Sequence, residues 1–297
     1  MKKGYNTAFT FSNLNNNRIP ITNLIKIMND NKENPSLLRF SGGSLSFQYD
    51  ISNEEYGNSN TNKYENFVNP KNYIYDFIEL VKGLINMPKI VYCLNLHPFL
   101  ITKKFDTIEN CLLPLKFFKE KLGNDSVVTI ELGNELYMYF IKDVKFYVEL
   151  CELLIPKIRE IFPNALISAP TESYKSRRGN KWNMNIMKIK GLDAISPHYY
   201  INTIKEANDI TEYTKKISYI ENSKIIKIDK KVCCTEYGFK YEKLLKFNYQ
   251  REKTIIDIME NQFKILNYTL IIYHTLLMND KSNWGKYIVK NKLIELR

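Results

Sequence analysis

The sequence predicts an α/β protein built as one (β/α)8 TIM barrel. Short segments rich in β-branched and apolar residues alternate with longer segments of helical spacing, and eight such alternations fit into 297 residues. A barrel of this kind takes about 250 residues. No break in composition divides the chain, so we expect a single domain over residues 1–297. No glycine-rich phosphate loop follows a predicted strand, which argues against an open nucleotide-binding sheet.

The individual elements follow from apolar periodicity and from residues that stop helices. In the first predicted helix, Ile21, Leu24 and Met28 share one face, and Gly123 is the stop signal of the third helix. The predicted strands are residues 5–11, 37–40, 89–95, 127–133, 165–169, 192–196, 231–235 and 269–273. The predicted helices are residues 20–28, 70–85, 106–122, 142–162, 183–189, 204–219 and 244–266, and a short tail follows the last strand. A polar loop, residues 48–69, is longer than an ordinary connection and is either a functional loop over the barrel mouth or an insertion.

Composition narrows the classes of function. The hydrophobic content of 44% supports a sizeable core, and no run of about 18 apolar residues predicts a membrane span. The net charge of +11 favours anionic partners such as nucleic acid, an acidic glycan or an anionic surface. Because the lysines are scattered along the chain, the charge alone does not choose among these partners.

The N-terminal segment and the cysteines bear on location. Lys2 and Lys3 are not followed by an apolar region, so we do not expect a signal peptide. Cys233 and Cys234 are adjacent in one predicted strand and should face opposite sides of it. We interpret all five cysteines as reduced packing residues without metal-ligand spacing, and we expect neither metal nor other cofactor. A cytoplasmic protein fits this pattern, as does a virion-associated protein if the chain is encoded by a phage.

Polar side chains collect where the predicted strands end. In a barrel, the active site lies at the C-terminal ends of the strands. All three histidines of the chain fall at such ends. The candidate site residues are Arg39, Asn95, His97, Asn134, Glu135, His198, Tyr199, Tyr200, Glu236 and His274, with Trp284 in the loop beyond the eighth strand.

Two carboxylates among these residues suit the cleavage of a glycosidic bond. Glu135 follows the fourth strand and Glu236 follows the seventh, so both reach the barrel mouth. One such carboxyl group protonates the leaving oxygen, and the other attacks the anomeric carbon or activates a water molecule. The attacking pair needs a separation of about 5 to 5.5 Å.

The chain resembles the clan of retaining (β/α)8 glycoside hydrolases that carry catalytic glutamates on strands four and seven. ELGNE at 131–135 is similar to the acid/base strand, TEYG at 235–238 to the nucleophile strand, and PHYY at 197–200 to the strand-six motif. LRFSGG at 38–43 is closest to the heparanase-like branch. Leu136 stands where the family usually has proline, and the β-sandwich of that branch has no counterpart here.

The resemblance implies a role for each of these residues. Glu135 is expected to be the acid/base, with a pKa above that of the nucleophile Glu236. Asn134 is expected to bind the 2-hydroxyl of the sugar. Arg39 and one of the two tyrosines, Tyr199 or Tyr200, are expected to keep the nucleophile ionised.

Further features concern structure and partners. Glu131 lies within the fourth strand and is expected to pair with a buried cation such as Arg39. The basic loop 175–181 is either solvated or binds the acidic groups of a glycan. Two rival functions stay open: a non-catalytic glycan-binding barrel, alone or as part of a virion or larger assembly, and a nucleic-acid-binding module, which has no recognition motif here. The sequence does not determine the oligomeric state.

Overall fold

The fold is a closed barrel of eight parallel strands. The structure is a computed structural model that describes residues 1–8, 10–11, 14, 17–43, 46, 74–105, 108–173, 176–201, 209, 215, 230–239, 249–279, 286–290 and 293–296. Each strand pairs with the next along the chain, and β8 closes the ring on β1. The strands are β1 (Lys2–Asn6), β2 (Leu37–Phe40), β3 (Lys89–Cys93), β4 (Val127–Glu131), β5 (Leu166–Thr171), β6 (Ala194–Ile201), β7 (Lys231–Phe239) and β8 (Leu270–His274). The predicted (β/α)8 barrel is therefore confirmed.

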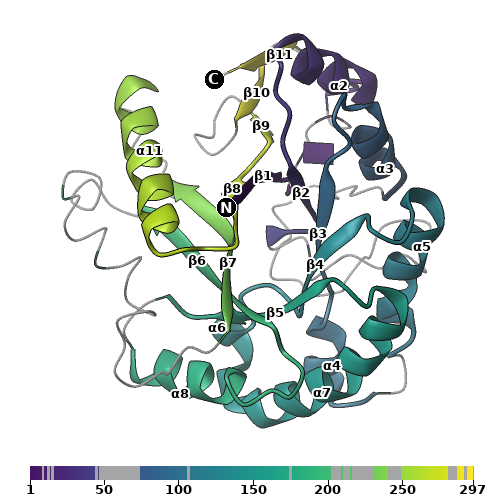
Figure 1. Ribbon diagram of the computed structural model, residues 1–297, viewed down its shortest axis with the longest axis vertical. Coiled ribbons are helices and arrows are strands. Elements are labelled where there is room, and N and C mark those ends of the chain that lie inside the picture. Colours follow the sequence, from purple (N-terminus) through teal and green to yellow (C-terminus); the bar gives the residue numbers. More distant parts are fainter. Residues whose placement is uncertain are drawn as a thin grey trace.

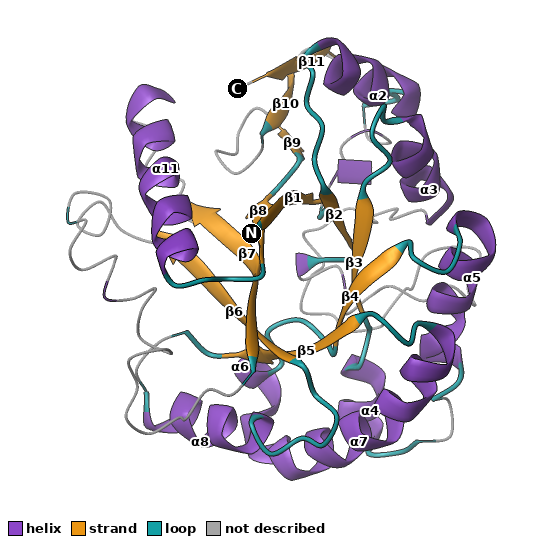
Figure 2. Ribbon diagram, in the orientation of Figure 1, coloured by secondary structure: helices purple, strands orange, loops and turns teal. Residues whose placement is uncertain are grey.

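Helices surround the ring of strands (Figures 1 and 2). They are α2 (Ile21–Asp30), α3 (Ile74–Gly83), α4 (His97–Thr102), α5 (Leu113–Leu122), α6 (Tyr137–Phe140), α7 (Val144–Ile161), α8 (Arg177–Ile186) and α11 (Tyr249–Ile265), with short 3-10 turns at Asn110–Leu112 and Ile141–Asp143. The main apolar core lies between helices and strands, and a smaller cluster fills the barrel. Cys233 belongs to the inner cluster and Cys234 to the outer one, as the strand periodicity predicts, and all five cysteines are free.

Several predicted boundaries were wrong, in each case because tertiary contacts extend or shorten a local pattern. The first strand ends at Asn6 instead of residue 11, since the chain turns at once and the Thr10 backbone N–H donates to the Thr7 carbonyl (3.0 Å). The sixth and seventh strands run on to Ile201 and Phe239, because pairing between them continues through the PHYY and TEYG motifs.

The helix predicted for residues 183–189 begins earlier, at Arg177. Ser176 caps it by accepting the Gly179 backbone N–H (2.8 Å), so most of the predicted basic loop is helical. The helix predicted for residues 204–219 falls almost entirely outside the described residues, and the loop 48–69 and Trp284 lie outside them.

The chain after β8 also differs from the expected short tail. It forms a three-stranded sheet of β9 (Leu277–Asn279), β10 (Tyr287–Lys290) and β11 (Leu293–Leu296). In Figure 1 this sheet lies between α11 and α2, where the outer layer of the barrel has no helix among the described residues. In the same described part of the chain, no helix is long and apolar enough to cross a bilayer.

Candidate active site

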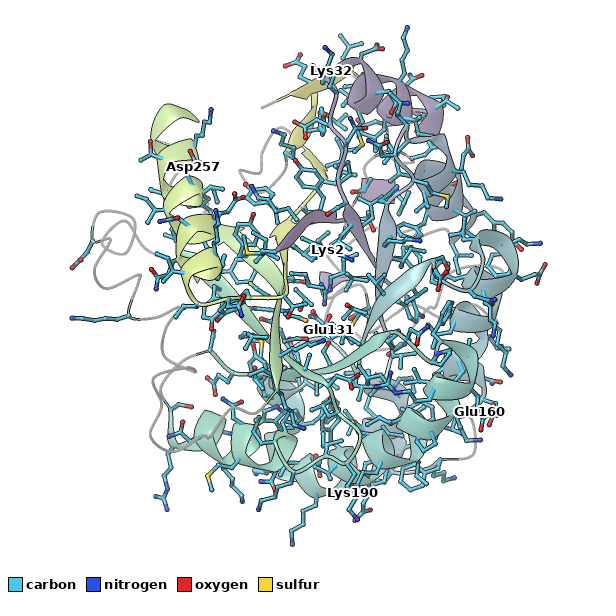
Figure 3. All side chains as sticks on the ribbon, viewed as in Figure 1. Lys2, Lys32, Glu131, Glu160, Lys190 and Asp257 are labelled. Carbon is cyan, nitrogen blue, oxygen red and sulfur yellow. The ribbon has the colours of Figure 1, made fainter. Side chains whose placement is uncertain are left out.

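A fully buried guanidinium joins two carboxylates at the centre of the barrel. Arg39 on β2 donates from Nε (2.9 Å) and Nη2 (2.5 Å) to Glu131 Oε2, and from Nη1 to Glu236 Oε1 (2.5 Å). Figure 3 shows Glu131 near the middle of the ring of strands. Burying charge is tolerated when each ion is paired and hydrogen-bonded. The predicted pairing of Glu131 with Arg39 is therefore confirmed, and the same arginine also contacts Glu236.

Glu236 is ionised by its surroundings. Burial by itself would raise the pKa of this carboxyl group, but His198, Arg39, His274 and the Tyr200 hydroxyl outweigh burial and hold the pKa well below its usual range. The Tyr200 hydroxyl donates to Glu236 Oε2. His274 Nδ1 lies 3.8 Å from the same oxygen.

An irregularity in β7 brings two consecutive side chains into the barrel. The register of β7 against β8 shifts between Cys234 and Tyr237, so Thr235 and Glu236 both point inward. Thr235 Oγ1 donates to Glu131 Oε1 (2.8 Å) and lies 2.9 Å from His198 Nε2. Because the single hydroxyl proton goes to Glu131, the oxygen accepts from His198, and Nε2 carries a proton.

The other nitrogen of His198 lies between the two predicted catalytic glutamates. Nδ1 is 3.2 Å from Glu135 Oε1 and 3.5 Å from Glu236 Oε2. These two oxygens are therefore at most about 6.7 Å apart, the sum of the two distances. Burial by itself would lower the pKa of His198, but Glu236, Glu131 and Glu135 outweigh it and raise the pKa to about 9. The imidazole is thus a cation at neutral pH.

Glu135 is placed by a sharp turn after β4. Gly133 has φ of 89° and Glu135 itself has φ of 41°, a conformation that side chains rarely adopt. A Cβ added at Gly133 would overlap the buried Leu136 side chain, so glycine is required there. The Tyr137 hydroxyl donates to Glu135 Oε1 (3.1 Å). The Glu135 side chain is 18% exposed against 3% for Glu236, so it lies nearer to solvent.

The structure distinguishes the two tyrosines that the sequence left open. Tyr200 points into the barrel and donates to Glu236. Tyr199 points outward, and its hydroxyl bonds the Tyr268 hydroxyl (2.8 Å) in the outer core. The alternation of side chains along a strand decides this, since neighbours face opposite sides.

The remaining predicted residues divide into two groups. Asn134 lies in the central network, where its Oδ1 accepts from Arg39 Nη2 (2.8 Å). Asn95 instead accepts the His97 backbone N–H (3.2 Å) at the start of α4, and the His97 ring packs edge-on against Phe140.

Sequence reasoning missed three residues of the network: Asn6, Thr235 and Tyr137. Asn6 Nδ2 donates to Glu236 Oε1 (3.0 Å) and lies 3.1 Å from His274 Nδ1. The sequence could have indicated Asn6 as a polar residue at the C-terminal end of the first strand. The predicted strand ran on to residue 11, so Asn6 was not recognised as its last residue. Thr235 and Tyr137 carry no sequence signal that separates them from ordinary strand and loop residues. In the described part of the chain, no cluster of three or more histidine, cysteine or acidic side chains could hold a metal ion.

The barrel and its paired glutamates define a class of protein. Two carboxylates from strands four and seven, within reach of each other at the C-terminal ends of parallel strands, are the arrangement of retaining glycoside hydrolases. Residues 71–271 match the family Cellulase (glycosyl hydrolase family 5). The chain belongs to this family and is a glycosidase of the clan that its motifs indicate. The finer placement in the heparanase-like branch is not confirmed.

Solved structures share the fold of this chain. The endo-1,4-β-D-mannanase from Thermotoga petrophila RKU-1 is 15% identical with a TM-score of 0.61, over 98% of this chain and 96% of that chain. The endo-1,4-β-mannanase from Rhizomucor miehei is 13% identical with a TM-score of 0.59, over 96% and 89%. The α-L-arabinofuranosidase from Thermotoga maritima is 13% identical with a TM-score of 0.55, over 93% and 60%. At these identities the likeness concerns the fold. No curated protein matches the sequence.

Proposed function

We propose that Glu236 is the nucleophile and Glu135 the acid/base of a double displacement in one catalytic domain. Glu236 attacks the anomeric carbon while Glu135 gives its proton to the leaving oxygen. Glu135 then takes a proton from the water that releases the sugar, and the anomeric configuration is restored. The observation that carries this proposal is the position of His198 Nδ1, 3.2 Å from one carboxylate and 3.5 Å from the other. The resulting limit of about 6.7 Å lies near the 5 to 5.5 Å of retaining pairs and below most of the 6.5 to 9.5 Å range of inverting pairs.

The roles are assigned by the surroundings of each carboxyl group. Glu236 is buried, ionised and held by donors from Arg39, Asn6 and Tyr200, which suits a group that must attack as an anion. Glu135 lies nearer to solvent, where leaving group and water can reach it.

His198 links the two steps. Its Nδ1 lies 3.2 Å from Glu135 and 3.5 Å from Glu236 without a well-aligned hydrogen bond to either, so a small rotation of the ring would let it donate to whichever carries more charge. Glu236 carries the charge in the free enzyme. Once Glu236 forms an ester with the sugar, Glu135 is the anion, and the same proton stabilises it. Asn134, fixed by Arg39, is proposed to bind the 2-hydroxyl of the sugar.

The substrate is an oligosaccharide or polysaccharide, and we propose that it carries acidic groups. Arg177, Arg178 and Lys181 are exposed in the first turns of α8. This helix follows β5, so its start lies at the end of the barrel that holds Glu135 and Glu236. Three unburied cations there would attract carboxylate or sulfate groups of a bound glycan. Replacing the two arginines by glutamine should raise KM for an acidic polysaccharide and leave KM for a neutral one unchanged.

Replacement of each glutamate tests the assignment. Glu135→Ala and Glu236→Ala should each abolish turnover with the fold intact, because Arg39 keeps Glu131 as its partner when Glu236 is removed. Circular dichroism and thermal melting provide the folding control. Azide should rescue Glu236→Ala on an aryl glycoside and give a glycosyl azide of inverted configuration, whereas Glu135→Ala should give the retained one. Wild-type-like turnover by either variant would sink the assignment.

The rival function, a non-catalytic glycan-binding barrel in a virion or larger assembly, is not favoured by the family match. It requires binding without product. Incubation with a panel of glycans, followed by analysis for new reducing ends, separates the two.

A further inference from the structure

A row of three tyrosines runs across the outer wall of the barrel. Tyr237 on β7 is paired with Tyr273 on β8, and Tyr273 is paired with Tyr5 on β1. Their ring centroids are 5.6 Å and 6.4 Å apart. The neighbouring residues on β1 and β8, Asn6 and His274, face inward and contact each other (3.1 Å). The tyrosine row therefore lies on the opposite side of the same wall from the site.

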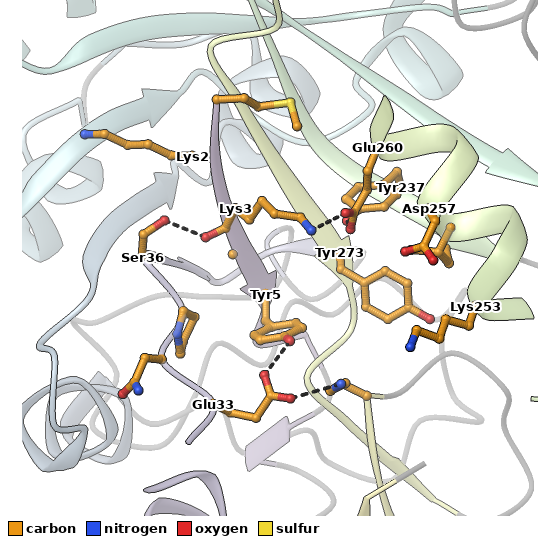
Figure 4. A pocket seen from close by; sticks show the side chains of 16 residues that line it. Lys2, Lys3, Tyr5, Glu33, Ser36, Tyr237, Lys253, Asp257, Glu260 and Tyr273 are labelled. Carbon is orange, nitrogen blue, oxygen red and sulfur yellow. Dashed lines mark hydrogen bonds and ion pairs between the residues drawn. The ribbon is translucent and has the colours of Figure 1, made fainter. Parts of the chain in front are cut away.

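Helices cover only one end of this row of tyrosines. Tyr237 is buried and packs on Phe263 of α11 (5.4 Å), whereas Tyr273 and Tyr5 are only partly buried. Among the described residues no helix lies between α11 and α2 to cover them (Figure 1). A cavity of about 710 Å³ opens here, within the size range of ligand sites. Figure 4 shows the Tyr5 and Tyr273 rings inside it.

Two of the three rings are held in place by carboxylates. The Tyr5 hydroxyl donates to Glu33 Oε2 (2.9 Å), and the Tyr237 hydroxyl donates to Glu260 Oε1 (2.6 Å). Glu260 also pairs with Lys3. Glu33, Glu260 and Lys3 keep further hydrogen-bonding capacity, since a carboxylate oxygen accepts more than one bond and an ammonium donates three.

Charge balance and geometry exclude most classes of ligand. The lining combines four lysines with three acidic residues and few aliphatic side chains, so it suits neither a lipid chain nor the apolar face of a helix. A nucleic acid needs a large surplus of cations, but three acidic residues nearly balance the four lysines, and Lys3 and Lys286 are paired with Glu260 and Glu33. An extended peptide needs a free strand edge, which β1 and β8 lack in a closed barrel.

Aromatic ring faces bordered by paired acids and lysines are what a saccharide requires. The C–H faces of a sugar ring pack on aromatic rings, and its hydroxyls both donate to carboxylates and accept from ammonium groups. Exposed Lys253 and Asp257 of α11 extend this polar border on one side of the cavity (Figure 4).

We propose that this cavity, lined by Tyr5, Tyr273, Glu33, Lys253 and Asp257 and called here the outer tyrosine groove, binds a segment of a saccharide chain. It is separate from the barrel mouth and needs none of the residues of the hydrolytic site. It would hold a polysaccharide against the enzyme while another part of the polymer is cleaved.

Binding is measured without turnover in a Glu135→Gln/Glu236→Gln background. The probes are mannohexaose, cellohexaose and an acidic oligogalacturonate, in titration calorimetry, and the matching polysaccharides in affinity electrophoresis. Tyr5→Ala/Tyr273→Ala should weaken binding at the groove at least fivefold. Tyr75→Ala, a tyrosine 68% exposed on α3, is the matched control and should bind as the parent does.

A second variant guards against damage to the barrel wall. Lys253→Ala/Asp257→Ala changes only exposed residues of α11 and should weaken binding in the same direction. In the otherwise wild-type enzyme, both groove variants should cleave a small aryl glycoside with unchanged kcat/KM and a polysaccharide with lower kcat/KM.

Two results would overturn the proposal. One is parent-like binding of all three probes by both groove variants, each with an unchanged melting temperature. The other is that the groove variants bind only the acidic probe more weakly than the parent does, and that this difference disappears when salt is added. Such a result would mean simple charge attraction. Neither depends on whether the barrel mouth hydrolyses the probe, so the groove and the proposed hydrolysis fail independently.

Discussion

The buried His198 cation predicts a specific loss of stability at alkaline pH. Its pKa rises from an ordinary value of 6.5 to about 9 in the folded chain. A group with a raised folded pKa stabilises fully below the unfolded pKa and loses that contribution as the pH rises through the folded pKa. The contribution of His198 should therefore be complete below about pH 6.5 and disappear through about pH 9.

The magnitude follows from the shift. At 1.36 kcal/mol for each pKa unit, this change corresponds to about 3 kcal/mol of unfolding free energy. Three carboxyl groups face the imidazole: Glu131 on β4, Glu135 on the turn after it, and Glu236 on β7. The Thr235 hydroxyl on β7 also faces it. His274 on β8 and Arg39 on β2 act on it through their contacts with Glu236. The charge of Glu236 and the hydrogen bonds to Glu131 and Glu135 outweigh burial, which explains the sign of the shift.

Urea unfolding of the wild type and of His198→Gln, measured at intervals between pH 6 and pH 10, isolates this contribution. Lysine and cysteine titrations affect both proteins and cancel in the comparison. The stability difference between the two should shrink by about 3 kcal/mol across the interval. A direct nuclear magnetic resonance titration of the imidazole completes the test. Parallel stability curves, or an imidazole that titrates at or below its ordinary value, would refute the reasoning.

Four substitutions test other contacts of the structure. Thr235→Val removes the hydroxyl between Glu131 and His198, so two buried partners lose a hydrogen bond. The variant should lose about 2 to 4 kcal/mol of unfolding free energy, and the alkaline limb of its pH–rate profile should shift. An unchanged pH–rate profile would contradict the assignment of the Nε2 proton of His198. Tyr200→Phe should lower kcat at least tenfold with little change in melting temperature. Tyr199→Phe should instead cost about 1 kcal/mol of stability and leave kcat unchanged. If the two variants changed kcat and stability equally, Tyr200 would not point inward and Tyr199 outward. Gly42→Ala should reduce kcat, since the added Cβ overlaps Asn6 Oδ1 and Arg39 Nη1; wild-type kinetics would show that neither group needs its position.

Patterns that repeat along the chain were predictable, and contacts that depend on exact register were not. The eight strands were found because buried parallel strands are short apolar runs between helical segments. The alternative left open at PHYY could not be decided, because a shift of one residue exchanges the inward and outward faces of a strand. The boundary error at β1 hid Asn6 for the same reason, since only its place as the last residue of the strand turns it toward Glu236.

By itself, the sequence determined the fold class and predicted that Glu135 and Glu236 lie near the C-terminal ends of strands four and seven, because both follow from periodicity and from motifs that are local in the chain. Only the tertiary structure decided that Tyr200 contacts Glu236 and that Thr235 joins Glu131 to His198. It also decided that the wall of β8 and β1 carries a tyrosine groove that no helix of the described residues covers. These features join residues more than thirty positions apart or depend on a register shift within β7. Neither a distant contact nor a register shift can be predicted from a local sequence pattern.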